Sequence, residues 1–251
     1  SIFMIITMSQ VKLWQNSIML FSHTLQVTVD NPIIHNNLGV TLMELGRYKE
    51  AWAHYIKSLE TNPNYADAQY NLGDLLARQG KDQEAMAQFA KTLRIKPSHA
   101  EAHNHMGVIL MTKQGKTQEA INHFTEAVRA NSNYGVAYRN LGIAMINQGR
   151  DQEAIPYLRE VLRINPRDYI SHNNLGGAVS RQGKIAEAMA HYTQALQINP
   201  VCAEAHYNLG SLLALQRKDE EAMIHFNEAL WINPRDAQVH YQIGGILARQ
   251  G

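Results

Sequence analysis

The chain has 251 residues, of which 45% are apolar and 18% charged, and its net charge is +1. This apolar content is too high for an intrinsically disordered chain, and the mean hydropathy of −0.32 excludes a polytopic membrane protein. The 23 basic and 22 acidic residues nearly cancel, which gives no general attraction to nucleic acid, and the single cysteine, Cys202, excludes a disulfide framework or a cysteine-based zinc site.

The first 31 residues differ from the rest of the chain. Residues 1–13 begin with the stretch SIFMIITM, which is apolar on all sides but much shorter than the roughly 20 residues that span a bilayer. Two interpretations stay open for it, an irregular capping segment and the stub of a membrane helix. Residues 14–31 carry Phe21 and Leu25 at helical spacing and a small residue at Ser17, which predicts an amphipathic helix without a matching helix before it.

A glycine then recurs along the chain at intervals of 34 or 35 residues, and such a period is typical of a repeated helical or strand unit. The recurring glycines are Gly39, Gly73, Gly107, Gly142, Gly176, Gly210 and Gly244. We divide the chain into six complete repeats, 32–65, 66–99, 100–134, 135–168, 169–202 and 203–236, and a truncated seventh, 237–251. Because the pattern stops within a repeat, we expect the chain to be a segment of a longer protein.

Each repeat predicts two amphipathic helices. When the recurring glycine is numbered position 8, apolar or small residues recur at positions 4, 7, 8 and 11 and again at 20, 24, 27 and 28, both with helical spacing. A glycine at position 15 is expected to end the first helix, and a proline at position 32 the second. The small residues at positions 8 and 20 should let the two helices approach closely. The residues expected to cap the second helices are Asp82, Thr117, Asp151 and Asp219.

This pattern, with Leu-Gly at positions 7–8, Ala at 20, an aromatic residue at 24 and Pro at 32, resembles the tetratricopeptide repeat. The resemblance covers residues 32–251 and implies an all-α fold, a right-handed superhelical solenoid of stacked antiparallel helix pairs. The departures are local: position 4 is mostly histidine, and the 100–134 repeat has one extra residue and Ser132 in place of the closing proline. Together with Pro156 inside the next second helix, they lead us to expect altered stacking in this part of the chain.

A second resemblance concerns residues 12–28, KLWQNSIMLFSHTLQVT, followed by HNNLG at 35–39. This stretch resembles the junction after the last membrane helix in bacterial multi-spanning glycosyltransferases with C-terminal tetratricopeptide repeats. The resemblance implies a non-catalytic accessory tail, tethered at its N-terminus on the extracytoplasmic face of a bacterial membrane. Without that resemblance, the location expected for such a repeat protein is cytoplasmic.

The reactive-looking residues are explained by the repeat rather than by a catalytic or metal site. Nine histidines fall at positions 4 and 23, and equivalent positions of stacked helices lie roughly 8–10 Å apart, too far to share one metal ion. We therefore expect their ring nitrogens to bond to neighbouring groups, and we expect no metal and no cofactor. No nucleophilic triad, GxGxxG string or phosphate-binding loop stands out, so we expect no enzymatic activity in this segment. The nine histidines are His35, His54, His103, His123, His172, His191, His206, His225 and His240.

The concave side of the solenoid is the predicted binding site. By family geometry, positions 2, 5, 6, 9, 12 and 13 of the first helices face inward, and position 6 carries a column of asparagines, Asn37, Asn71, Asn140, Asn174 and Asn208. The column resembles the asparagine ladder of O-linked N-acetylglucosamine transferase, which implies amides that hold an extended peptide backbone. An amide offers both a donor and an acceptor, which matches the N–H and C=O of a peptide. The alternative interpretation is that these asparagines cap or bridge neighbouring helices.

Further inward-facing residues complete the predicted peptide-binding set. They are Val40, Met43, Tyr70, Asp74, Arg139, Ile143 and Tyr207. Acidic and basic residues are mixed along this face, which disfavours RNA as a ligand. The sequence therefore predicts a non-catalytic scaffold that binds a protein or peptide in its concave groove. Two alternatives remain, the accessory tail of a membrane glycosyltransferase and self-association through the open ends, where Ile243 and Leu247 would lack a covering helix.

Overall fold

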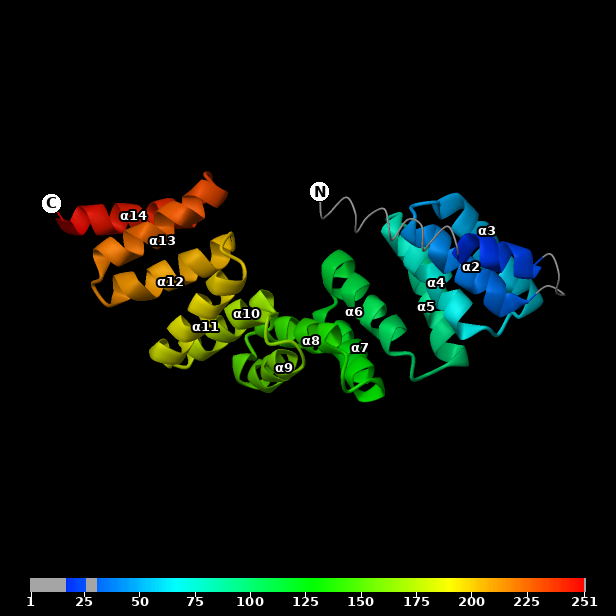
Figure 1. The fold of residues 1–251 in the computed structure, drawn as a ribbon. Helices are drawn as coiled ribbons and strands as arrows, with labels where there is room; N and C mark the ends of the chain where they lie inside the picture. The colour runs from blue at the N-terminus through cyan, green and yellow to red at the C-terminus, as the bar shows by residue number, and fades with distance from the viewer. Residues whose placement is uncertain (1–16, 26–30, 251) are drawn as a thin grey trace. The chain divides into compact units, whose positions relative to one another are not determined.

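The computed structural model describes residues 17–25 and 31–250, which form helices and no strands (Figure 1). The predicted segment 1–13 lies outside the described residues, and of the predicted helix 14–31 the described part, 17–25, is helical. Within the described ranges, none of the helices combines the length and the apolar character that crossing a membrane requires.

The repeats are built from consecutive pairs of helices of similar length. The pairs are α2 (Pro32–Glu44) and α3 (Tyr48–Thr61), α4 (Ala66–Arg78) and α5 (Asp82–Ile95), α6 (Ala100–Gln114) and α7 (Thr117–Ala130), α8 (Gly135–Asn147) and α9 (Asp151–Ile164), α10 (Tyr169–Arg181) and α11 (Ile185–Ile198), and α12 (Ala203–Leu215) and α13 (Asp219–Ile232), followed by α14 (Ala237–Gln250). The predicted all-α fold class is confirmed.

The chain divides into two modules, Ser1–Asn131 and Ser132–Gly251, which we call the N-terminal and the C-terminal module. The boundary falls where Ser132 replaces the closing proline of the repeat. Each module has a hydrophobic core of its own. Leu72 and Phe89 lie in the core of the N-terminal module, and Leu175 and Phe226 lie in that of the C-terminal module.

Close approach of the two helices explains the small residues at positions 8 and 20. The alanines at position 20, such as Ala85 and Ala188, are fully buried. A Cβ atom added to Gly107 would lie 2.6 Å from Cε1 of Phe124, the position-24 residue of the same repeat, which is shorter than a van der Waals contact. The ring therefore occupies the space that a side chain on the first helix would need. The predicted role holds for the recurring glycines of the six complete repeats but not for Gly244, where an added Cβ would meet nothing within 4 Å.

The turn inside each repeat places position 15 in the left-handed region of backbone conformation. Gly183, for example, has a φ of 77°, and in the sixth repeat the same conformation is adopted by Arg217, with a φ of 62°. A side chain is disfavoured in this region because Cβ approaches the following carbonyl oxygen. Arg217 is therefore a strained position in an otherwise regular turn.

The predicted caps of the second helices are wrong. The second helices α5, α7, α9 and α13 begin at these residues: Asp82, Thr117, Asp151 and Asp219. In each helix the preceding residue is the N-cap, and its side chain makes no capping hydrogen bond. The three aspartates instead lie in the first turn, where their carboxylates interact favourably with the helix dipole. Side-chain caps occur on first helices, where Asn31, His99 and Asp168 accept from backbone N–H groups. Helix α9 is continuous through Pro156.

Candidate functional site

An open pocket of about 780 Å³ lies on the C-terminal module, along the first helices α10, α12 and α14. Three residues of the predicted binding set, Asn174, Tyr207 and Asn208, line it. Other lining residues at the predicted inward-facing positions are Asn173, Gly177, Ser180, Arg181, Glu204, Ser211, Gln238 and Gln242. The pocket thus follows the positions that family geometry assigns to the concave side.

The asparagines of this pocket are joined by hydrogen bonds between successive first helices. Asn208 on α12 donates through Nδ2 to Oδ1 of Asn173 on α10, at 3.1 Å. Asn173 in turn donates to Oε2 of Glu204, at 3.2 Å, while Asn174 donates to the carbonyl oxygen of Ile170, at 2.8 Å. These bonds fix the orientation of the amides. Because an amide has two N–H groups and an oxygen with two lone pairs, each bond leaves further hydrogen-bonding capacity at the half-buried Asn174 and Asn208.

The charges in the pocket are held by neighbours on the protein. Arg181 reaches from α10 to Asp151 at the start of α9, with 2.7 Å between Nε and Oδ2. Asp236 caps α14 by accepting from the backbone N–H groups of Gln238 and Val239. The polar lining is therefore preorganised, and its charged groups serve first to hold the helices in place.

The N-terminal module has an equivalent asparagine bond. Asn71 on α4 donates to Oδ1 of Asn36 on α2, at 2.8 Å, and Asn36 is buried. In the next repeat, position 6 carries His105, whose Nε2 lies 3.3 Å from the hydroxyl of Tyr70. Burial lowers the pKa of His105. Asn71 and Asn208 at position 6 therefore bridge adjacent repeats, one in each module, as the alternative interpretation predicted, whereas Asn174 bonds within its own helix. Asn174 and Asn208 still border the pocket of the C-terminal module.

The remaining predicted residues lie in different surroundings. Asp74 is buried and accepts from Nε of Arg78 at 3.0 Å, while Arg139 forms an ion pair with Asp168, the cap of α10. Both charged side chains are thus engaged within the protein. The other members of the predicted set, Asn37, Val40, Met43, Asn140 and Ile143, are half-buried.

Sequence reasoning missed Asn173, which joins the asparagine column from position 5. The signal was present, because position 5 carries asparagine in the first, third and fifth repeats, at Asn36, Asn104 and Asn173. All three are buried. A buried amide needs hydrogen-bond partners, so asparagine at this position indicates a bond to a neighbouring helix.

Each of the nine histidines at positions 4 and 23 bonds to a neighbouring group through at least one ring nitrogen, as the sequence predicts. Four repeats pair the rings of positions 4 and 23 through their Nδ1 atoms, at 3.0 or 3.1 Å: His35 with His54, His103 with His123, His172 with His191 and His206 with His225. In the last three pairs, Nε2 of the position-4 ring donates to the carbonyl oxygen of a proline. Across residues 17–25 and 31–250, no three His, Cys, Asp or Glu side chains converge as metal ligands.

Comparison with known proteins agrees with the repeat pattern. Sequence models described as tetratricopeptide repeat match residues 30–98, 98–167 and 173–239. Among solved structures, YrrB, a TPR protein with an unusual peptide-binding site, is 25% identical over 74% of this chain and 96% of its own, with a TM-score of 0.66. PilF of Pseudomonas aeruginosa is 18% identical over 87% of this chain and 97% of its own, with a TM-score of 0.74, and MamA is 24% identical over 65% and 95%, with a TM-score of 0.57. A search of curated proteins finds no match.

Proposed function

Because the chain belongs to the tetratricopeptide repeat family, we propose that it is a non-catalytic scaffold that binds an extended peptide segment of a partner protein on the concave side of its C-terminal module. The observation that carries the proposal is the pocket along α10, α12 and α14, with Asn174 and Asn208 at equivalent positions of successive repeats. YrrB, which resembles 74% of this chain, is a TPR protein with an unusual peptide-binding site.

The spacing of the two amides suits a peptide backbone. Successive first helices pack roughly 8–10 Å apart, and an extended peptide advances about 3.3 Å per residue, so one amide meets about every third residue. Each amide can offer one donor and one acceptor to the peptide. The half-buried ring of Tyr207, which lines the same pocket, adds apolar surface for a ligand side chain.

The test begins with a peptide selected from a random library against the whole chain. In the double variant Asn174→Ala with Asn208→Ala, up to four bonds of about 0.5–1.5 kcal/mol each are lost, so we expect the affinity to fall at least about tenfold by calorimetry. The fold should persist with a loss of about 1 kcal/mol, because Asn173 loses its partner on α12.

The matched control is Asn71→Ala. It removes the same kind of bond between repeats, to Asn36, but it lies in the N-terminal module, away from the pocket. It should lower the stability by a similar amount and leave the peptide affinity unchanged. Two outcomes would contradict the proposal: the double variant loses stability but keeps its peptide affinity, or Asn71→Ala loses as much affinity as the double variant. In either case the asparagines would only bridge neighbouring helices.

The role as the tail of a membrane glycosyltransferase rests on the resemblance of residues 12–28 alone, of which the structure describes residues 17–25. Self-association through α14 rests on the exposed side chain of Leu247, which is 55% accessible. Two other apolar residues of this helix, Val239 and Ile246, are already buried. Neither of these observations points to a ligand, so the concave pocket is the site that we put forward.

A further inference from the structure

The second repeat departs from the others at the contact between positions 4 and 23. Where four repeats place a pair of hydrogen-bonded histidines, this repeat has Gln69 on α4 and Gln88 on α5. Gln69 is only 8% exposed, and its Oε1 atom has no hydrogen-bond partner among the described residues. A buried amide oxygen without a donor is unfavourable unless a ligand supplies one.

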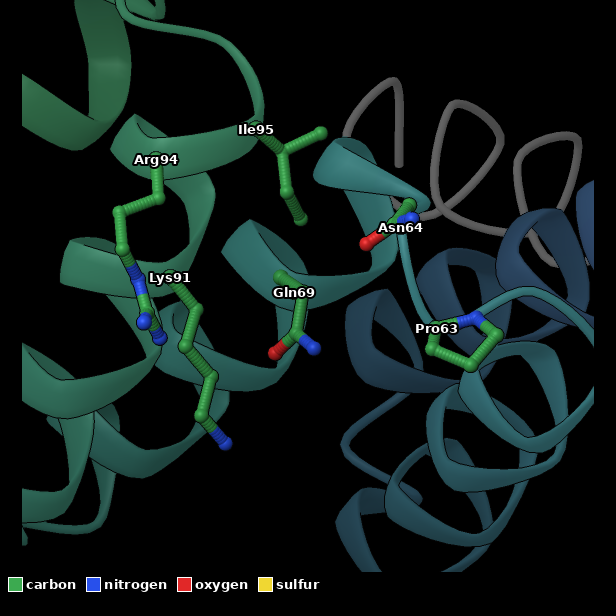
Figure 2. A pocket seen from close by; sticks show the side chains of 6 residues that line it. All are labelled: Pro63, Asn64, Gln69, Lys91, Arg94 and Ile95. Atoms are coloured by element: carbon green, nitrogen blue, oxygen red, sulfur yellow. The ribbon is translucent and has the colours of Figure 1, made fainter.

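Gln69 lies in the wall of an open pocket of about 570 Å³ in the N-terminal module. In Figure 2, its amide lies between Lys91 and Arg94 on α5 and the α3–α4 connection, which contributes Pro63 and Asn64. A pocket of about 300 Å³ lies beside His103 and His123 in the third repeat, and one of about 470 Å³ lies beside His206 and His225 in the sixth. The volume of the Gln69 pocket falls in the range of sites that bind small ligands or single side chains.

The charge of this pocket is unlike that of the other repeats. Lys91 and Arg94 occupy positions 26 and 29 of the second helix, three residues apart and on the same side. The first, third and fourth repeats place an ion pair at these positions: Lys57 with Glu60, Glu126 with Arg129, and Glu160 with Arg163.

Only α5 carries two cations there, and in the part of the chain that the structure describes neither cation has a carboxylate partner. Like charges at this spacing repel and weaken the helix. Lys91 and Arg94 are therefore available to bind an anion from outside the repeat.

We propose that this pocket binds an acidic peptide segment of a partner protein, with an Asp or Glu carboxylate on Lys91 and Arg94 and a backbone N–H on the oxygen of Gln69. A carboxylate accepts from the guanidinium and the ammonium group, and a peptide N–H is the donor that the Gln69 oxygen lacks. Inorganic phosphate or sulfate would satisfy the cations but brings no N–H for the amide. The site belongs to α4 and α5 and is separate from the concave pocket of the C-terminal module.

The experiment measures the binding of a fluorescein-labelled hexaglutamate peptide to the whole chain by fluorescence anisotropy at low ionic strength. The key variant is Lys91→Glu, which places a glutamate three residues before Arg94, the arrangement that α7 and α9 already have. This variant should fold at least as well as the natural chain and bind the peptide at least about tenfold more weakly. The matched control, Lys49→Glu on the exposed start of α3, changes the net charge equally and should alter the affinity by less than about twofold.

A second variant, Gln69→Leu, tests the N–H contact. It removes the oxygen that lacks a partner, so it should preserve or raise the melting temperature while weakening the binding of hexaglutamate by roughly fivefold to tenfold. Equal losses for Lys91→Glu and Lys49→Glu would show general charge attraction and overturn the proposal. Displacement of the peptide by inorganic phosphate, together with unchanged binding to Gln69→Leu, would indicate a simple anion site and would overturn it as well.

Discussion

The recurring glycine and the residue at position 24 of the same repeat form one packing unit. At Gly107 an added Cβ would meet the rigid ring of Phe124 at 2.6 Å, so we expect Gly107→Ala to lower the free energy of unfolding by about 1–3 kcal/mol through overpacking. Gly244 is its matched control, because it holds the same repeat position and an added Cβ would meet nothing within 4 Å.

At Gly244 the same substitution should raise the stability by about 0.5–1 kcal/mol, since alanine favours the helix more than glycine does. Urea denaturation of both variants measures the two effects. If Gly107→Ala and Gly244→Ala shifted the midpoint in the same direction, the close approach of the helices would not be the reason for the glycine at position 8.

Arg217 offers a second test on a single side chain. Five turns of this kind have glycine in the left-handed conformation, and Arg217 adopts it with a φ of 62°. Replacing it with glycine removes backbone strain of roughly 1 kcal/mol, so Arg217→Gly should raise the denaturation midpoint. The reverse change in the preceding repeat, Gly183→Arg, should lower it by a similar amount. If the two variants shifted the denaturation midpoint in the same direction, backbone strain at this position would not explain the result.

Between the two helices of a repeat, the histidine pairs predict how stability depends on pH. Burial, and then the charge of the partner ring, lowers the pKa of His54, His123, His191 and His225, while glutamates one turn before each histidine act in the opposite direction. A histidine whose pKa is lower in the folded state binds fewer protons there than in the unfolded chain. Its stabilising contribution is therefore complete above about pH 6.5 and is lost as the pH falls through the lower, folded-state pKa.

We expect the melting temperature to fall by at least about 2–4 °C between pH 7 and pH 5, the shift that roughly 1 kcal/mol produces in a chain of this size. Replacing the four position-23 histidines with glutamine, the residue that Gln88 already provides at this position, should remove most of this dependence. Thermal unfolding followed by circular dichroism at several pH values measures it. The same pH dependence in the natural chain and the variant would contradict the assignment to these pairs.

The helix pairs and their contacting faces follow from the sequence, because a 34-residue period with helical spacing leaves few alternatives for the buried side. Positions 8, 20 and 24 are predictable for the same reason. The caps of the second helices are not, because an acidic residue favours both the cap and the first turn, and only the backbone distinguishes the two at Asp82.

Asparagine at position 5 indicates a bond to a neighbouring helix, but the sequence does not identify Asn208 as the partner of Asn173, since that depends on how successive first helices are rotated against each other. The pocket at Gln69 becomes visible only when the same position is compared across repeats and found to lack its ring.

On the scale of the whole molecule, two modules with separate cores present different surfaces. The C-terminal module has the asparagine-lined concave pocket, and the N-terminal module has the cationic pocket beside Gln69. Cys202 is half-buried, and burial raises the pKa of its thiol, which disfavours the reactive thiolate.

The central claim, that an extended peptide lies on the concave side of the C-terminal module, is tested most directly by photo-cross-linking. A library-selected peptide with one photoreactive residue is irradiated with the whole chain, and the joined residues are identified by mass spectrometry. We predict cross-links to residues of α10, α12 and α14 that line the pocket, among them Asn174, Tyr207 and Asn208, and their loss when the unlabelled peptide competes. Competed cross-links confined to the second helices α11 and α13, or to the N-terminal module, would contradict the account.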